Sequence, residues 1–163
     1  YGESDSMGGL DLIIIQDSRE QTALTFTDKR IKDIRIEKLL VGDYGAELGD
    51  GRRLPLIFER KSLNDLWGSL TQNYERFRNE ILRAKESNIQ LIIIVEHSLS
   101  EISRGNGYSN RPSSSLLAQI FYLRSKYGIQ TVFCNNRLEA SSYIEHSFIA
   151  LAKYTINTER GCG

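Results

Sequence analysis

The sequence predicts an α/β domain of three layers, in which helices flank a mixed β-sheet. Short apolar runs rich in β-branched residues, at Leu10–Asp17 and Ile89–Glu96, are typical of buried strands. Apolar residues in steps of three and four between Ser62 and Ser87 indicate an amphipathic helix. Strand and helix patterns then alternate, which favours strands connected by crossover helices.

The first half of the chain is predicted to pair as antiparallel strands. After the first strand, Ile34–Leu48 predicts a strand, a bend at Gly-Asp and a second extended segment. The Asp-Gly pair within Leu48–Leu54 predicts a hairpin turn. Leu54–Lys61 is then the return strand, and the proline near its start suits the beginning of a strand or an edge.

Ser62–Ser87 carries the clearest helix pattern. Ser62 is a suitable N-cap, and Asp65 follows it as in a capping box. We expect the apolar stripe to lie in the core, and Trp67 to pack there rather than to stack on a base. The residues of the stripe are Leu63, Leu66, Trp67, Leu70, Tyr74, Phe77, Ile81 and Ala84.

The second half predicts two further helices around a strand. Ile129–Phe133 is the strand, and Gly128 before it suits a helix terminator. The helices are expected at Ser114–Tyr127 and Leu138–Tyr154, and a loop rich in Gly, Asn and Ser at Ser103–Ser115. These crossovers, added to the antiparallel half, give the mixed sheet.

Composition indicates a single globular domain. The chain has 163 residues, with 21 basic and 21 acidic side chains and a formal net charge of zero, so contact with nucleic acid would depend on local clusters of charge. We expect the domain to cover residues 10–156. The polar, Gly-rich ends, 1–9 and 157–163, are expected to be flexible or artificial.

Cysteine usage and hydropathy favour an intracellular protein, in the nucleus, nucleoid or cytoplasm. Cys134 and Cys162 form no CxxC pair, so neither a disulfide framework nor a zinc site is indicated. The apolar run Leu91–Val95 is far shorter than the roughly 20 residues that span a bilayer. We therefore expect no membrane association.

Several acids lie where predicted strands end. Asp17 ends the first strand, Asp43 lies at the bend, Glu59 ends the return strand, and Asp65 is in the first turn of the helix. Carboxylates brought close together repel, and burial makes their charge costly. A hard divalent cation such as Mg²⁺, which prefers oxygen ligands, relieves both effects.

Glu59, Arg60 and Lys61 follow an apolar run without a break. On an extended strand Glu59 and Lys61 point to one face and Arg60 to the other. A cation there can orient an attacking water or offset phosphate charge. The alternative for these three residues alone is an ordinary solvated strand end.

The whole pattern resembles the signature of the XPF-type structure-selective nucleases. That signature is Gly-Asp, a variable gap, Glu-Arg-Lys, three residues and Asp. An Asp-x-Arg-Glu segment precedes it, which Asp17–Glu20 matches, and the resemblance extends from about Leu10 to Tyr154. The signature positions here are Gly42, Asp43, Glu59, Arg60, Lys61 and Asp65.

The resemblance implies a restriction-endonuclease-like nuclease fold and DNA cleavage that depends on Mg²⁺ or Mn²⁺. Cleavage would occur near duplex–single-strand junctions, in repair, recombination or fork processing. The implied metal ligands are Asp43, Glu59 and the Arg60 backbone carbonyl, with Lys61 as a catalytic residue.

The segment that precedes the signature is implied to support the catalytic set. Asp17 and Glu20 would act through a water or a second metal, with Asp17 as a further candidate ligand. Arg19 would brace the carboxylates or contact phosphate. For Asp65, capping of the helix and support of the site both stay open.

Two departures from the family pattern are evident. The usual helix arginine falls on Tyr74 and the usual glutamine on Arg78, so Arg76 is a candidate substitute. The pair of helix-hairpin-helix motifs that family members usually add has no counterpart in this sequence. The chain is expected to be either a nuclease domain separated from such motifs or a minimal member of the family.

Basic and aromatic residues suggest partners. The basic residues are either solvated surface charges or contacts to DNA phosphates, and the loop Ser103–Arg111 is either ordered by DNA or a plain connector. The family dimerises through its last two helices, so we expect a homodimer or heterodimer there, with Phe121, Tyr122, Tyr143 and Phe148 as its aromatic patch. The DNA-contact candidates are Arg52, Arg53, Arg76, Arg78, Arg104 and Arg111, beside Arg83 and Lys85.

Two other functions are alternatives to an active nuclease. The first is a catalytically silent partner that binds DNA and dimerises with an active subunit; the presence of every acid and of Lys61 argues against it. The second is a nucleotide-binding domain, which is disfavoured because no Gly-rich phosphate loop follows a predicted strand.

Overall fold

The computed structural model describes residues 10–103 and 113–161. The predicted N-terminal end 1–9 and most of the Ser103–Ser115 loop, with Arg104 and Arg111, lie outside these ranges. Within them, no helix combines the length and the apolar character that crossing a membrane would require.

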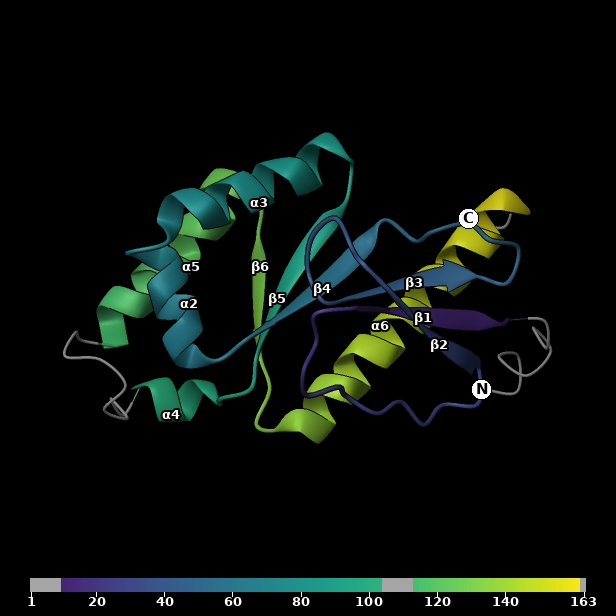
Figure 1. Ribbon diagram of the computed structural model, residues 1–163, viewed down its shortest axis with the longest axis horizontal. Coiled ribbons are helices and arrows are strands. Elements are labelled where there is room, and N and C mark those ends of the chain that lie inside the picture. Colours follow the sequence, from purple (N-terminus) through teal and green to yellow (C-terminus); the bar gives the residue numbers. More distant parts are fainter. Residues whose placement is uncertain (1–9, 104–112, 162–163) are drawn as a thin grey trace.

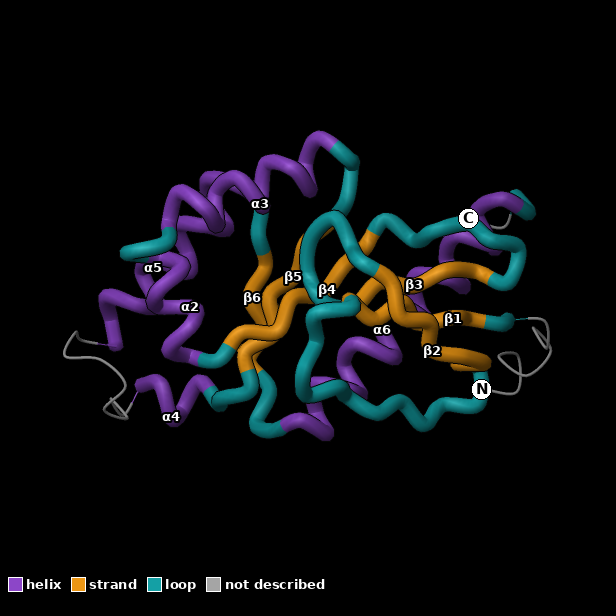
Figure 2. Tube along the Cα trace, viewed as in Figure 1, coloured by secondary structure: helices purple, strands orange, loops and turns teal. Residues whose placement is uncertain are grey.

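In the described part of the chain, six strands form one mixed sheet in the order β2-β1-β3-β4-β5-β6, with β2 and β6 at its borders (Figure 1, Figure 2). β3 pairs in antiparallel orientation with β1 and β4, whereas β5 pairs in parallel orientation with β4 and β6. The strands are β1 (Leu12–Asp17), β2 (Ile31–Glu37), β3 (Tyr44–Leu48), β4 (Leu56–Lys61), β5 (Gln90–Val95) and β6 (Gln130–Phe133).

Helices cover both faces of this sheet, which confirms the three-layer prediction. Strand β5 shows the division, because its side chains alternate between the faces: Ile92 and Ile94 pack toward α6, and Leu91, Ile93 and Val95 toward the other helices. The helices are α2 (Leu63–Leu70), α3 (Tyr74–Glu86), α4 (Leu99–Ser103), α5 (Ser113–Tyr127) and α6 (Arg137–Glu159). Figure 1 shows α6 crossing one face alone.

The β1–β2 pair corrects one expectation. These strands are parallel, although antiparallel pairing was predicted for the first half of the chain. Residues 18–30 connect them as an irregular crossover instead of a tight turn, and parallel neighbours need such a connection. The predicted hairpin between β3 and β4 is confirmed, with Gly51 at φ 95° in its turn.

The helix predicted over Ser62–Ser87 is wrong in one respect, because it is divided into α2 and α3. The backbone amides of Thr71 and Asn73 both donate to the Gly68 carbonyl, and the Thr71 hydroxyl donates to the Trp67 carbonyl. These bonds replace the regular helical ladder. The apolar stripe continues across the break, so its spacing could not reveal the corner.

The ends of α6 and its aromatic residues also differ from expectation. α6 extends to Glu159, beyond the predicted end at Tyr154. Phe148 is fully buried, edge-on to the Phe58 ring at a centroid distance of 5.2 Å. It therefore belongs to the core and not to an exposed aromatic patch. Tyr143 also packs edge-on against Phe58.

Candidate active site

Asp43 is fixed between the ends of two strands. Its backbone carbonyl accepts from the Asp17 amide at 2.8 Å, and its backbone amide donates to the Phe58 carbonyl at 2.8 Å. Its carboxylate Oδ2 accepts from the Arg60 amide at 2.7 Å. The bend just before β3 thus carries the Asp43 side chain to the end of β4.

Gly42 makes that bend possible. Its φ is +72°, a conformation that favours glycine. A Cβ at this position would lie 2.3 Å from the Ile57 side chain and 3.1 Å from the Phe58 carbonyl oxygen. The Gly-Asp pair therefore has a local structural reason as well as a chemical one.

Glu59 and Lys61 lie on the same face of β4, as predicted. Lys61 Nζ is 3.3 Å from Glu59 Oε2 and 5.2 Å from the centroid of the Phe77 ring in α3. Glu59 is buried, with 8% of its surface exposed. Its Oε2 has the Lys61 ion pair but no hydrogen-bond donor among the described residues.

The pKa values of both carboxyl groups are raised. Burial is the main cause that raises the pKa of Asp43, to about 6, and the charges of Glu20 and Asp17 add to this rise. The hydrogen bond from the Arg60 amide opposes it. For Glu59, burial raises the pKa well above its usual value, with contributions from the Glu80 carboxyl and from Asp43, and Lys61 opposes them. Raised pKa values in a buried acid, Glu59, and in a half-buried neighbour, Asp43, are typical of a functional site.

An open cavity of about 900 Å³ contains these groups. Its walls are the ends of β1, β3 and β4 on one side and the corner of α2 and α3 on the other. Among the residues that line it are Asp17, Arg19, Asp43, Glu59, Arg60, Lys61, Asp65, Trp67, Arg76, Phe77, Glu80 and Arg83. The cavity is therefore polar, and it brings together most of the predicted catalytic residues.

Asp17 and Arg19 form a closed unit at the edge of the cavity. Asp17 is 2% exposed, and both of its carboxylate oxygens accept hydrogen bonds, from Arg19 and from the Leu39 amide. These bonds lower the pKa of Asp17 although burial, the largest single influence, raises it. Asp17 thus braces Arg19, and its predicted role as a metal ligand stays a prediction.

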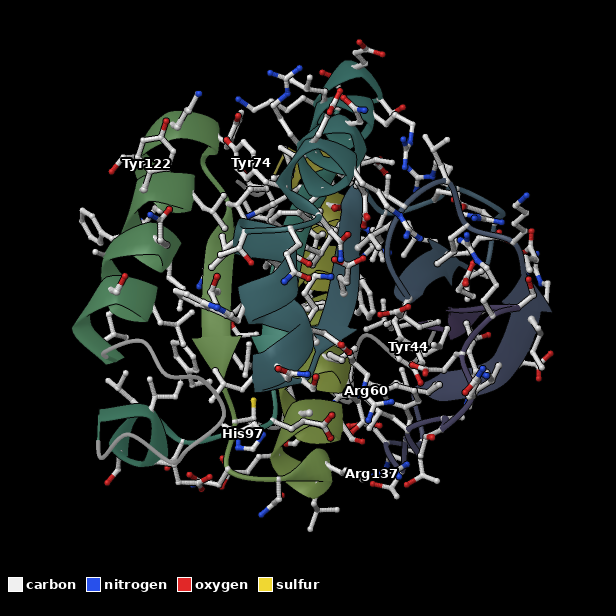
Figure 3. All side chains as sticks on the ribbon, turned by 60° about the vertical axis from the view of Figure 1, so that its left-hand side comes forward. Tyr44, Arg60, Tyr74, His97, Tyr122 and Arg137 are labelled. Atoms are coloured by element: carbon white, nitrogen blue, oxygen red, sulfur yellow. The ribbon has the colours of Figure 1, made fainter. Side chains whose placement is uncertain are left out.

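Arg60 points to the opposite face of β4, as predicted. Its guanidinium donates to Glu96 at 2.8 Å, to Glu20 at 3.2 Å and to the Thr22 carbonyl at 2.6 Å. Arg137, at the start of α6, also reaches the segment after β1 by donating to the Ala23 carbonyl. Figure 3 shows Arg60 and Arg137 in the same part of the molecule.

This network holds Glu20 through its ion pair with Arg60. Glu20 is paired with Arg60, yet its charge still raises the pKa of Asp43. Direct action of Glu20 at the reacting centre stays a prediction, as does metal binding by the Arg60 carbonyl. Sequence reasoning did not find Glu96, the second partner of Arg60.

Asp65 has the capping geometry that its sequence position indicated. The Asp65 amide donates to the Ser62 hydroxyl at 3.0 Å, so Ser62 is the N-cap of α2. The Asp65 side chain is exposed and lines the cavity. The Ser62 cap is therefore confirmed, whereas a capping or catalytic role of the Asp65 carboxylate stays a prediction.

The basic residues fall in different places. Arg76 and Arg83 line the cavity from α3, whereas the charge of Arg78 acts on Tyr127, toward α5. Arg52 pairs with Asp50 and Glu159, and Arg53 with Glu37 and Glu47, on the hairpin side of the sheet. Contact of Arg52, Arg53 or Arg78 with DNA stays a prediction.

Glu80 is an acid of this cavity that the sequence reasoning missed. It lies on α3 beside the apolar stripe, between Phe77 and Ile81, which are both buried. A position flanking the buried stripe was the available signal. The motif gave no reason to look for an acid so far along the helix.

The donor set fits a hard divalent cation. Asp43 and Glu59 offer carboxylate oxygens, and Mg²⁺ usually takes one or two carboxylates together with waters and substrate phosphate. Within the described ranges, no cluster of three or more His, Cys, Asp or Glu side chains is arranged to hold a metal. The residues present therefore suit an ion that shares its ligands with solvent and substrate.

Comparisons with known proteins place the chain in a family. The sequence model of the ERCC4 domain matches residues 16–147. The structure of XPF from Aeropyrum pernix in complex with DNA is similar to this chain with a TM-score of 0.57 and 22% identity, over 90% of this chain and 66% of that one. A second structure of XPF from Aeropyrum pernix gives a TM-score of 0.55 and 21% identity, over 88% and 61% of the two chains.

This chain thus spans less than two thirds of each of those XPF chains. No curated protein sequence matches it. The likeness in structure supports the predicted fold, and the family match covers both the Gly-Asp and the Glu-Arg-Lys segments. The chain therefore belongs to the ERCC4 domain family, that of the XPF-type nucleases.

Proposed function

We propose that this chain is a metal-dependent endonuclease that hydrolyses phosphodiester bonds in DNA. The observation that supports it best is the arrangement of Asp43, Glu59 and Lys61 at the ends of adjacent strands. Two acids with raised pKa values and one lysine face an open polar cavity there. The cofactor would be Mg²⁺ or Mn²⁺.

Each of these residues has a role in the proposal. The carboxylates of Asp43 and Glu59, with the Arg60 carbonyl, would hold the cation. When bound, the cation supplies positive charge for the scissile phosphate and lowers the pKa of water. Lys61 orients the attacking water or offsets phosphate charge, because its ammonium lies beside Glu59. Products with 5′-phosphate and 3′-hydroxyl ends are expected.

The proposed substrate is branched DNA, cut near a duplex–single-strand junction during repair or recombination. Support comes from the family and from the XPF structure determined with DNA. Arg76 and Arg83 line the cavity that holds the acids, and the exposed Arg19 lies at its edge. These side chains would position the phosphates.

A nicking assay tests the proposal. Wild type is incubated with flap, fork, bubble and nicked substrates in Mg²⁺ or Mn²⁺, beside Asp43→Asn and the control Asp33→Asn. Asp33 is an exposed acid on β2, outside the cavity. Cleavage by wild type and the control, and none by Asp43→Asn, is expected. Equal cleavage by all three proteins would refute the assignment of the site.

One observation favours a second function, DNA binding without cleavage as the partner of an active subunit. Tyr74 stands where the family usually has an arginine, and its hydroxyl contacts that of Tyr127, 3.0 Å away on α5. Stoichiometric binding of every substrate without cleavage in either metal would support this function instead.

Dimerisation remains part of the proposal. Phe121 and Tyr122 on α5 are 68% and 46% exposed, and Tyr154 on α6 is 67% exposed. A homodimer or heterodimer that covers them would remove this apolar surface from water. Light scattering on the purified chain, compared with a Phe121→Ser variant, checks whether it self-associates.

A further inference from the structure

Trp67 belongs to two environments at once. On α2 it packs against the core cluster that contains Leu66 and Phe77, which agrees with the packing predicted for it. It is nevertheless only half-buried, and it lines the cavity that contains Asp43 and Glu59. Part of a large aromatic side chain is therefore open to the space in which cleavage is proposed to occur.

Exposed apolar surface is scarce in this cavity, whose walls are mainly charged and polar. Of the apolar residues that line it, Val41 and Phe77 are buried. Leu40, which is 54% exposed and lies just before the bend at Asp43, and Trp67 provide the rest. A ligand that covered the indole ring of Trp67 would remove apolar surface from water, which is favourable.

Gly68 leaves room on the cavity wall next to Trp67. A glycine within a helix is unfavourable relative to alanine. Among the described residues, a Cβ at Gly68 would meet only Asn73 Nδ2, at 3.8 Å, which is an ordinary contact distance. Packing therefore does not require a glycine here, and a side chain at this position would narrow the cavity.

Positive charge lies in the same cavity as the indole. Arg76 and Arg83 line it from α3, and Arg19, with a side chain 63% exposed, lies at its edge. Proteins that bind single-stranded nucleic acid combine cations for the phosphates with aromatic rings on which bases stack. This combination favours DNA with an unpaired base over a small apolar ligand.

We propose that Trp67 is a stacking platform for an unpaired base of the DNA substrate. This inference rests on the proposed function and adds a reason why a junction would be preferred to a continuous duplex. In a duplex, neighbouring bases cover both faces of each base, whereas a base that is already unpaired leaves the stack at a lower cost. Trp67 binds that base, and Arg76 and Arg83 bind phosphates.

Intrinsic fluorescence tests the assignment directly, because Trp67 is the single tryptophan of the chain. The full chain is titrated without divalent metal with three DNAs. These are a fork, the same fork with abasic sites in place of the unpaired bases next to the junction, and a continuous duplex. At saturation the fork should quench the emission of Trp67, and the abasic fork and the duplex should quench it clearly less.

Variants separate stacking from packing. Trp67→Leu keeps an apolar side chain against the core but has no aromatic plane, whereas Trp67→Phe keeps a smaller plane. Trp67→Leu should bind the fork about 5- to 150-fold more weakly, as loss of a base-stacking side chain does, and Trp67→Phe should lose less. Both should bind the abasic fork as wild type does. Leu82→Ala, at an exposed residue of α3 that does not line the cavity, is the control and should bind every DNA as wild type does.

The outcomes separate this inference from the proposed function. Equal quenching by the fork and the abasic fork would overturn the stacking role while cleavage by wild type stands, and this comparison decides even if Trp67→Leu does not fold. Equal loss of affinity for both forks in Trp67→Leu would do the same. If wild type binds DNA only with Mg²⁺, single-turnover cleavage of the two forks replaces the titration, and equal rates would overturn the role. Absence of both DNA binding and cleavage in wild type would overturn the two proposals together.

Discussion

The Arg60 backbone amide donates a hydrogen bond of 2.7 Å to the Asp43 carboxylate. This bond joins the two segments of the motif, which the β3–β4 hairpin separates in sequence. The same residue thus contributes its backbone to the catalytic face and its guanidinium to the opposite face of the sheet. Arg60 therefore both fixes the position of the Asp43 carboxylate and places a positive charge on the opposite face of the sheet.

Arg60→Ala is expected to destabilise the protein by about 3 kcal/mol, in the range for removing one partner of a buried ion pair. The Arg60 side chain is 12% exposed, and its loss leaves Glu20 and Glu96, at 13% and 22%, without their cation. Urea unfolding measures the change. Arg53→Ala, at a side chain 47% exposed, should cost less than about 1 kcal/mol.

Gly42→Ala is expected to destabilise the fold by about 2–4 kcal/mol. Its left-handed backbone costs roughly 1–2 kcal/mol for a residue with a Cβ, and contact with Ile57 adds an overpacking term. Gly51→Ala is the matched control, because Gly51 also has positive φ but open space around it. Equal losses of melting temperature in both variants would contradict the steric argument.

Asp43→Asn should stabilise the metal-free protein at pH 7.5. Burial raises the pKa of folded Asp43 from 3.8 to about 6. The folded state therefore binds more protons between these values, and wild-type stability falls as the pH rises through about 6. The gain on substitution is on the order of 2 kcal/mol.

Unfolding of both proteins in EDTA at pH 7.5 and pH 4 measures this difference. It should shrink at pH 4, where Asp43 is protonated in the folded wild type. In the variant, the amide oxygen of the substituted side chain can still accept from the Arg60 amide, so the fold itself should persist. A difference that does not depend on pH would contradict the attribution to Asp43 ionisation.

Lys61→Met should lower cleavage by about 100-fold or more, as loss of one positioned proton-transfer or charge-stabilising group does. Mn²⁺ affinity should stay the same or rise, because Glu59 loses the ammonium that competes with the ion. Single-turnover nicking and Mn²⁺ titration are read together. If cleavage and Mn²⁺ affinity were both lost, Lys61 would act on metal binding instead.

Arg76→Ala should weaken binding to forked DNA and reduce the slope of log affinity against log salt by about one. Arg52→Ala, on the hairpin side of the sheet and paired with Asp50, should change neither quantity. Fluorescence anisotropy without divalent metal measures both variants. If Arg52→Ala weakened binding and Arg76→Ala did not, the DNA would instead bind along the β3–β4 hairpin.

The core of the site was predictable because its chemistry is local in sequence. Glu59 and Lys61 are on one strand, so alternation alone placed them on one face. The fold class followed from apolar runs whose two faces are both buried, as in β5. The Ser62 cap was predictable for the same reason, since donor and acceptor are three residues apart.

What failed depended on contacts between distant segments. Glu80 joins the site only because the chain turns at Thr71–Asn73, and the apolar stripe does not record that turn. The parallel β1–β2 pair follows from a crossover without regular structure. Phe148 was assigned to the surface because its partner, Phe58, lies on a strand far away in sequence.

Helices α5 and α6 are attached to opposite sides of the β6 border. A second molecule that contacted both helices could not bind to one face of the sheet alone. It would have to bind across the β6 edge. Asp43 and Glu59 lie further inward, at the ends of β3 and β4. A dimer of this kind would leave the cavity that contains Asp43 and Glu59 accessible to a DNA duplex.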